Sequence, residues 1–129
     1  TGVQTCALPI CKLGMQTTGN AGGSHHLTLK SKKTPKGGLP ALLKEMGTGL
    51  LVTELMGQGV NYVTGDYSRG AFGYWVENGE IQYPVEEVTI AGNLRDMLLD
   101  IQLIGSDTLI RGTKETGSIL LGSMTVGGK

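Results

Sequence analysis

The sequence predicts an α+β domain that consists mostly of antiparallel β-sheet with two short helices. Two stretches carry apolar residues at helical spacing, and runs of β-prone residues follow one another with short connections. Glycine accounts for 22 of the 129 residues, more than double the average share of about 7%. Because glycine adopts positive φ angles freely, this excess between β-type runs indicates many tight turns. Runs of strands with segregated helices are typical of α+β folds.

The first elements precede residue 60. Alternation over residues 26–29 predicts a short strand, and the lysine-rich residues 30–38 predict a surface loop. Pro40 suits the first turn of a helix, and Gly47 or Gly49 ends it. The helix carries apolar residues at i, i+3, i+4 and i+7, namely Leu39, Leu42, Leu43 and Met46. A buried strand is expected over Gly49–Leu55, with the break at residues 56–59.

A hairpin gives the clearest local pattern. Asn78-Gly79 separates the β-prone residues 71–76 from residues 81–84, and this dipeptide favours a two-residue type I′ turn. Pro84 predicts that the returning strand ends there or runs along an edge of the sheet. A further strand is expected over residues 85–91.

The second helix follows that strand. Asn93 can cap a helix that Gly105 closes, because its side chain can accept from the first free backbone N–H groups. The apolar stripe of this helix has the same spacing as the first and consists of Leu94, Met97, Leu98 and Ile101. The last strands are expected over residues 118–121 and 124–126.

Charge and hydropathy exclude two classes of partner. The formal net charge is zero and the pI is about 6.6, which gives no electrostatic reason to expect nucleic acid or an anionic membrane. No apolar run reaches the roughly 18 residues that a transmembrane helix needs. No signal-peptide pattern is present either, so we expect a cytoplasmic protein.

No metal or catalytic site is predicted within the chain. The only histidines, His25 and His26, are adjacent at the start of a predicted strand, where neighbours point to opposite faces and cannot easily bind one ion. The simpler interpretation places both in a polar loop, where they bond to the backbone. Cys6 and Cys11 are too few for a disulfide framework and are not credible third ligands. Neither a nucleophile elbow nor a phosphate-binding loop is found. We therefore expect no cofactor and no catalytic residue here.

The most distinctive polar segment is Gly65–Gly70, predicted to be a loop before the hairpin. Arg69 could clamp a carboxylate, either that of Asp66 or a peptide terminus. The alternative is a structural loop in which Asp66 satisfies its own backbone. The candidate residues for binding a peptide or a partner are Asn20, His25, Asp66, Ser68 and Arg69.

The first residues differ in kind from the rest. Thr1–Ile10 resembles, codon by codon, the translation of a common sequencing-library adapter, and Cys11 fits a codon that begins with the adapter's last base. The alternative is a natural short strand or loop. We predict that residues 1–11 are not native and that residues 12–129 form a C-terminal domain that is incomplete on its N-terminal side.

Three blocks, residues 18–29, 49–98 and 116–128, resemble the C-terminal region of the TldD/PmbA family, on its PmbA-like (TldE-like) side. The run GDYSRGAFGYWVENGEIQYPVEEVTIAGNL over residues 65–94 carries most of the resemblance. The likeness extends over nearly all of residues 12–129 and is weakest in the lysine-rich segment 30–36.

The resemblance implies a part in a heteromeric metallopeptidase that trims unfolded or leader peptides. The TldD-like subunit holds the divalent metal with a His-Glu-x-x-x-His helix and a downstream cysteine, and the PmbA-like subunit lacks that motif. Thr116 before Gly117 aligns with the downstream cysteine, and a hydroxyl is a poorer ligand than a thiolate.

Two functions follow from the resemblance. The first is a noncatalytic subunit that pairs with a TldD-like metal-bearing subunit and binds an unfolded or leader peptide. The alternative is a non-enzymatic regulatory or binding protein of the DNA gyrase modulator type. Zero net charge and the lack of a basic stripe with aromatic residues argue against direct contact with nucleic acid. Whether the whole protein is an enzyme stays open at this point.

Overall fold

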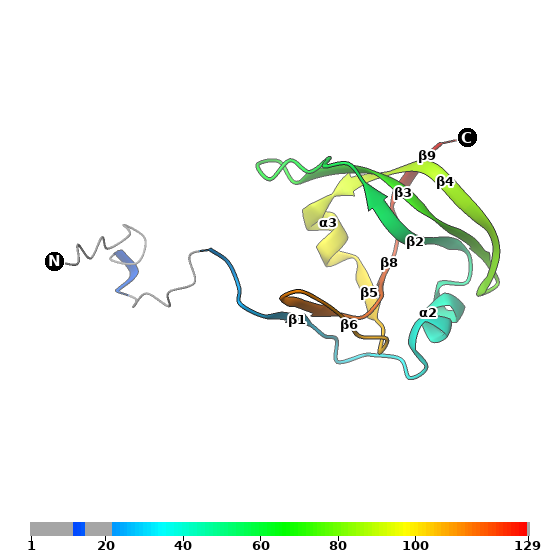
Figure 1. Cartoon of the computed structure of the whole chain (residues 1–129), viewed down its shortest axis with the longest axis horizontal. Coiled ribbons are helices and arrows are strands. Elements are labelled where there is room, and N and C mark those ends of the chain that lie inside the picture. Colours follow the sequence, from blue (N-terminus) through cyan, green and yellow to red (C-terminus); the bar gives the residue numbers. More distant parts are fainter. Residues whose placement is uncertain (1–11, 15–21, 129) are drawn as a thin grey trace.

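The computed structural model describes residues 12–14 and 22–128 of the chain. Within residues 22–128, nine strands form three small sheets, and two helices accompany them (Figure 1). Asn20 and the adapter-like Thr1–Ile10 lie outside the described residues. The elements in chain order are β1 (Leu27–Leu29), α2 (Gly38–Met46), β2 (Gly49–Met56), β3 (Asp66–Glu77), β4 (Glu80–Asn93), α3 (Leu94–Leu99), β5 (Ile101–Ile104), β6 (Leu109–Arg111), β7 (Lys114–Thr116), β8 (Ile119–Leu121) and β9 (Thr125–Gly127).

The largest sheet is antiparallel and has the order β2-β3-β4-β9. Its centre is the hairpin β3–β4, whose two-residue turn has φ angles of 53° at Asn78 and 77° at Gly79. Positive φ at both central residues is what a type I′ turn requires, so the predicted hairpin is confirmed. Trp75 pairs with Tyr83 and Val76 with Ile81.

The sheet curves strongly because both neighbours of β3 bulge opposite one residue, Phe72 (Figure 1). In β2 the extra residue is Thr53, and in β4 two residues, Glu86 and Glu87, oppose Phe72. Glu87 takes a φ of 56°, a left-handed conformation. Bulges bend a strand and increase its twist, so the sheet becomes concave on the side that holds the core.

The core of this sheet is small and lies on one face. Ala71, Val88 and Ile90 are buried. Partly buried side chains that pack against them are Leu50, Val52, Tyr67, Val85 and Met124. Helix α2 adds Leu42 and Leu43, which are also buried, near the turn of the hairpin.

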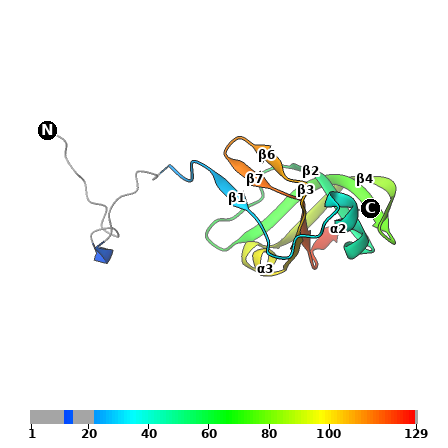
Figure 2. The same cartoon turned by 90° about the horizontal axis from the view of Figure 1, so that it is seen from below.

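The concave face of the large sheet looks toward three other elements, α2, α3 and the β5–β8 pair, and none of them covers its outer face (Figures 1 and 2). Asn93 caps α3 as predicted, because its side chain accepts from the backbone N of Arg95 at 3.1 Å. Gly47, with a φ of 70°, ends α2 as predicted.

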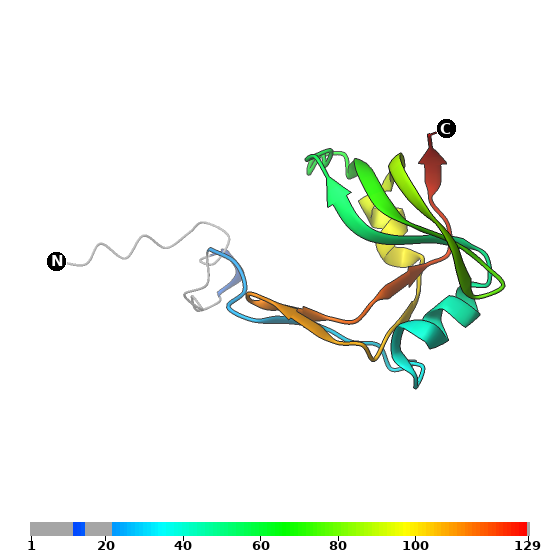
Figure 3. The same cartoon turned by 45° about the vertical axis from the view of Figure 1, so that its right-hand side comes forward.

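The third sheet, β1-β7-β6, extends away from this body as an arm (Figures 1 and 3). Strand β1 pairs with β7 in parallel, and β7 pairs with β6 in antiparallel. Gly112 and Thr113 form the two-residue turn between β6 and β7, and Gly112 has a φ of 59°. Strand β1 was predicted from the sequence, whereas the β6–β7 hairpin was not.

Four sequence predictions were wrong in detail. Gly65–Gly70 is not a loop, since β3 begins at Asp66. The two strands expected over residues 81–91 are one strand, β4, which passes through Pro84 along a stretch that β9 does not pair with. The second helix ends at Leu99, and Ile101 begins β5 instead of completing the helix. Strand β2 is half-exposed rather than buried. In these segments, pairing with strands distant in sequence and the actual exposure of each strand decide the structure, and the local preference of the sequence for loop, helix or buried strand does not.

Candidate functional site

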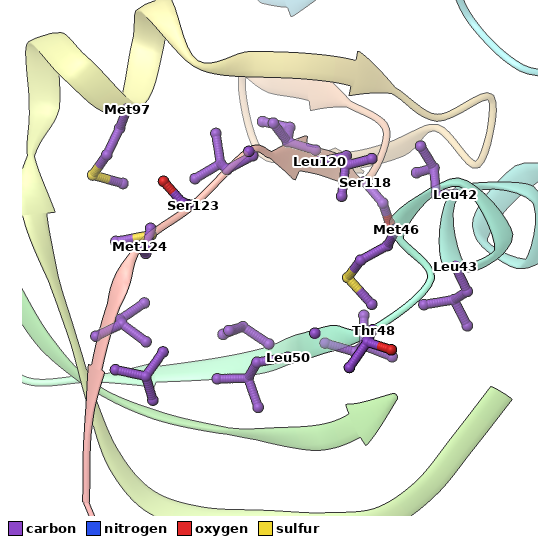
Figure 4. Close-up of a pocket in the computed structure, with 18 of the residues that line it drawn as sticks. Leu42, Leu43, Met46, Thr48, Leu50, Met97, Ser118, Leu120, Ser123 and Met124 are labelled. Atoms are coloured by element: carbon purple, nitrogen blue, oxygen red, sulfur yellow. The ribbon is translucent and has the colours of Figure 1, made fainter. Parts of the chain in front are cut away.

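An apolar cavity of about 710 Å³ lies inside the curved sheet (Figure 4). Helix α2 closes one side, β2 forms the floor, and the segment from Gly117 to Met124 crosses the opposite side. Met97 of α3 borders it as well (Figure 4). This volume falls in the range of about 300–1,000 Å³ that is typical of ligand pockets.

The cavity lining has no charged side chain and few polar ones. Met46 of α2, Met97 of α3 and Met124 of the β8–β9 connection reach it, and their side chains point toward the same central space (Figure 4). Flexible methionine side chains adapt to apolar surfaces of varied shape. The side-chain hydroxyl groups of the lining belong to Thr48, Tyr67, Ser118 and Ser123. Chemically, this lining suits apolar side chains with a small number of polar contacts, not a charged group.

Close backbone contact between Gly105 and the Gly117–Ser118 segment forms a junction that fixes one wall of the cavity. The N–H of Gly105 donates to the carbonyl of Ser118 at 2.7 Å, and a Cβ on Gly117 would collide with the Gly105 carbonyl oxygen. Asp107 accepts from both the N–H and the hydroxyl of Ser118, at 3.2 and 2.5 Å. The junction therefore fixes Ser118 beside the cavity. It also sets where the arm leaves the body.

Thr116 lies at the root of the arm, next to this junction. It is half-buried, and its hydroxyl donates to the carbonyl oxygen of Gly117 at 3.0 Å. In the register of the arm it lies opposite both Leu29 and Leu109. Paired residues share a face of the sheet, so Thr116 lies on the same face as these two leucines.

The structure separates the predicted Asp66–Arg69 pair, so the clamp between these two residues is wrong. Positions three apart on β3 point to opposite faces of the sheet. Asp66 instead accepts from the hydroxyl of Thr64 at 2.6 Å, and the Arg69 Nε donates to the carbonyl oxygen of Met56 at 3.4 Å. The alternative, in which Asp66 organises the local backbone, agrees better with these contacts.

The remaining predicted residues do not gather into one site. Ser68 is exposed, and its N–H donates to the carbonyl of Gly59 at 2.7 Å. His25 is exposed before β1, and the neighbouring His26 lies on the arm with its Nε2 3.2 Å from Oε2 of Glu115. The cavity could not be predicted from local sequence, because α2 and the segment from Gly117 to Val126 both line it and lie far apart in the chain. The only local signal for it was the run of methionine and leucine positions.

The described part of the chain contains neither a cluster of metal-binding side chains nor a membrane-spanning helix. Over residues 12–14 and 22–128, no three residues of the metal-binding types gather closely enough to hold an ion. Neither α2 nor α3 has the length and hydrophobicity that a membrane crossing requires.

These features define a class: an α+β domain in which a curved antiparallel sheet encloses an apolar cavity and carries a projecting three-stranded arm. The family model of the PmbA/TldA metallopeptidase C-terminal domain matches residues 9–128. The chain therefore belongs to this family, and the resemblance noted in the sequence is confirmed.

Named relatives agree with this assignment. The chain is 62% identical over 117 residues to the metalloprotease PmbA homolog of Haemophilus influenzae, and 55% identical over 118 residues to metalloprotease PmbA of Escherichia coli O157:H7. The matches cover 91% and 92% of this chain. They cover 26% of each relative, so this chain spans about a quarter of their length.

Solved structures share the fold. A Thermotoga maritima protein described as a candidate modulator of DNA gyrase superposes with a TM-score of 0.80 at 38% identity, over 92% of this chain and 28% of that protein. A Bacteroides thetaiotaomicron protein of the same description gives a TM-score of 0.78 at 28% identity, over 93% and 26%. The predicted fold class is thereby confirmed.

Proposed function

We propose that this chain is part of the noncatalytic subunit of a cytoplasmic heteromeric metallopeptidase that trims unfolded or leader peptides. A TldD-like subunit would supply the divalent metal and the activated water. This chain would contribute structure and peptide binding but no catalytic residue. The family membership and the name metalloprotease that its relatives carry support the link to peptide hydrolysis.

The observation that carries the noncatalytic role is Thr116. It stands where the resemblance implies the metal-binding cysteine of the TldD-like subunit. Its hydroxyl is engaged as a donor to the Gly117 carbonyl at 3.0 Å. A neutral hydroxyl binds borderline metal ions more weakly than a thiolate. A PmbA-like subunit that lacks the thiolate therefore depends on its partner for the metal.

The cavity supports a role in binding peptide. An unfolded polypeptide differs from its folded form chiefly in its exposed apolar side chains, and the cavity lining is apolar and free of charge. Its size would accept the side chains of an extended segment, and its methionines would tolerate different sequences. Selection would then rest on hydrophobicity and disorder more than on a particular residue.

A second candidate, a regulatory protein that modulates DNA gyrase, has one specific argument in its favour. Two structures with high similarity are described as candidate modulators of that enzyme. The zero net charge of this chain argues for an indirect effect through another protein rather than through bound DNA.

The test uses the full-length protein, purified alone and together with its TldD-like paralogue. We expect hydrolysis of an unfolded peptide only by the mixture, with chelator sensitivity and with the metal measured on the paralogue. Two variants of the full-length protein, Thr116→Cys and Thr116→Ser, separate two effects. The cysteine variant adds a thiolate that could bind the metal, whereas the serine variant changes only the packing. Chelator-sensitive cleavage by the partner-free protein would refute the noncatalytic role. Gyrase modulation that persists without the paralogue would favour the second candidate.

A further inference from the structure

The loop between β2 and β3 presents two apolar side chains to solvent. Tyr62 and Val63 have exposed fractions of 89% and 95%. Isolated exposed apolar residues are common on protein surfaces. This pair is unusual because the loop that carries it is held rigidly, which an unused surface loop does not require.

Asn61 organises the loop from inside. Its side-chain Oδ1 accepts from the N–H groups of Val63 and Thr64, at 2.9 and 3.2 Å, and its carbonyl accepts from Gly65 N at 2.7 Å. Its own N–H donates to the carbonyl of Asp66 at 2.8 Å. Such asparagine-centred turns fix the backbone locally.

The loop is also tied to the start of α3. Asn93 Nδ2 donates to the Thr64 carbonyl at 3.0 Å, and Leu94 N donates to the Gly65 carbonyl at 2.7 Å. The cap of α3 and the loop therefore share one asparagine. A rigid loop loses little conformational entropy when a partner covers it, which favours tight docking.

Other exposed apolar residues lie on the same side of the molecule. The β2–β3 loop, α3 and the arm all lie on the side of the domain that faces away from α2 and the hairpin turn (Figures 1 and 3). Exposed side chains on α3 are Leu98 and Leu99, and exposed side chains on the arm include Leu27 and Leu109. We call these four leucines, together with Tyr62 and Val63, the apolar flank.

The short, exposed strands of the arm also suggest that another part of the protein covers them. The strands of the arm have three residues each, and every residue of β1 and β6 is exposed. So short a sheet is marginal in water without packing.

We propose that the apolar flank is the docking surface for the region that precedes the C-terminal domain in the full-length protein. The matched relatives extend far beyond this domain, which covers only 26% of their length, and β1 is the first described strand, so the polypeptide enters the domain through the arm. A covalently linked region has a high effective concentration at this surface. The occupant presents an apolar pocket to Tyr62 and Val63 and an apolar face to α3 and the arm.

The test compares thiol labelling in this chain and in the full-length protein, both in a background without other cysteines. Tyr62→Cys and Leu109→Cys report on the flank. Tyr83→Cys is the matched control, because Tyr83 is a 55% exposed tyrosine on the hairpin, near the turn that the flank faces away from. We expect labelling at the two flank positions to slow about tenfold or more in the full-length monomer, with little change at residue 83.

A second measurement uses the full-length protein only and does not depend on folding of the shorter chain. Tyr62→Asp should accelerate proteolysis between the two regions, whereas Tyr83→Asp should not. Equal labelling of the flank in both proteins would overturn the proposal. So would protection that appears only when a second subunit or a peptide is added, since the occupant would then be a separate polypeptide.

Discussion

The hairpin β3–β4 and the arm β1-β7-β6 show two ways in which this sequence forms sheet. The hairpin has strands of 12 and 14 residues, its own buried core and a turn that the Asn-Gly dipeptide dictates. The arm has strands of three residues and no buried residue within them. The hairpin was evident in the sequence, whereas two of the three arm strands were not.

The difference reflects where the stabilisation comes from. Strands that bury one face alternate between apolar and polar residues, because the pleat sends neighbouring side chains to opposite sides. Residues of the arm do not contact a core in this chain, so burial does not require them to alternate between apolar and polar types. A weak strand pattern together with exposed leucines therefore indicates dependence on polypeptide outside the described structure. The predictions that follow test this contrast.

The largest effect is expected at Gly73, in the middle of the hairpin. A Cβ at this position would collide with the backbone carbonyl of Leu51 on β2, and the ladder leaves no room for the strands to separate. Gly73→Ala should lower the free energy of unfolding by about 3 kcal/mol. Gly70→Ala is the control on the same strand, because its Cβ would meet Met56 Cβ at an ordinary 3.5 Å. Equal urea midpoints for the two variants would contradict this packing.

The turn of the hairpin comes next. Gly79 has a φ of 77°, and a Cβ there would also lie 3.0 Å from the Cα of Lys44 on α2. Gly79→Val should therefore cost about 2 kcal/mol in chemical denaturation. Asn78→Gly keeps the positive φ accessible and should change stability by less than about 1 kcal/mol. A valine variant as stable as the parent chain would argue against the type I′ turn.

A smaller loss is expected at Asn93, which joins the hairpin body to the loop before β3. Its side chain caps α3 and donates to the Thr64 carbonyl. Asn93→Ala should cost about 1–2 kcal/mol, since both interactions are lost. Asn93→Asp retains the cap acceptor and should recover part of that loss. Thermal unfolding should rank the stability of the three proteins as parent, then Asn93→Asp, then Asn93→Ala. An aspartate variant less stable than the alanine variant would contradict the capping role.

The smallest effect is expected in the arm. Leu109→Ser in this 129-residue chain should change the free energy of unfolding by no more than about 0.5 kcal/mol, because the side chain is already exposed. Val88→Ala, which removes buried methyl groups from the hairpin core, should cost about 2 kcal/mol under the same conditions. A loss at Leu109 as large as that at Val88 would show that the arm is already packed within this chain.

Much of the fold could be read from local patterns. The helix stripe of Leu39 to Met46, the Gly47 stop, the Asn93 cap and the Asn78-Gly79 turn each depend on near neighbours in sequence, and each was predicted. The end of α3 could not be predicted this way. Ile101 continues the helical spacing, but its partner in the structure is Leu121 of β8, 20 residues further along the chain.

The site was harder to predict than the fold. Asp66, Ser68 and Arg69 were candidates from the sequence, but their contacts depend on strand pairing that local sequence does not encode. Asp66 is part of the hydrogen-bond network around Asn61, a residue the sequence analysis did not consider. Asn20 lies outside the described residues, and its role stays a prediction, as do the metal-bearing partner and the peptide substrate.

Hydrogen exchange of the 129-residue chain tests the contrast between a self-supporting body and a dependent arm most directly. Both are resolved in one experiment, so the hairpin is an internal reference for the arm. We predict that amides within β3 and β4 exchange at least about a thousandfold more slowly than those of β1, β6 and β7. Arm amides protected to within about tenfold of the hairpin would contradict the account, because the arm would then be stable without any additional polypeptide.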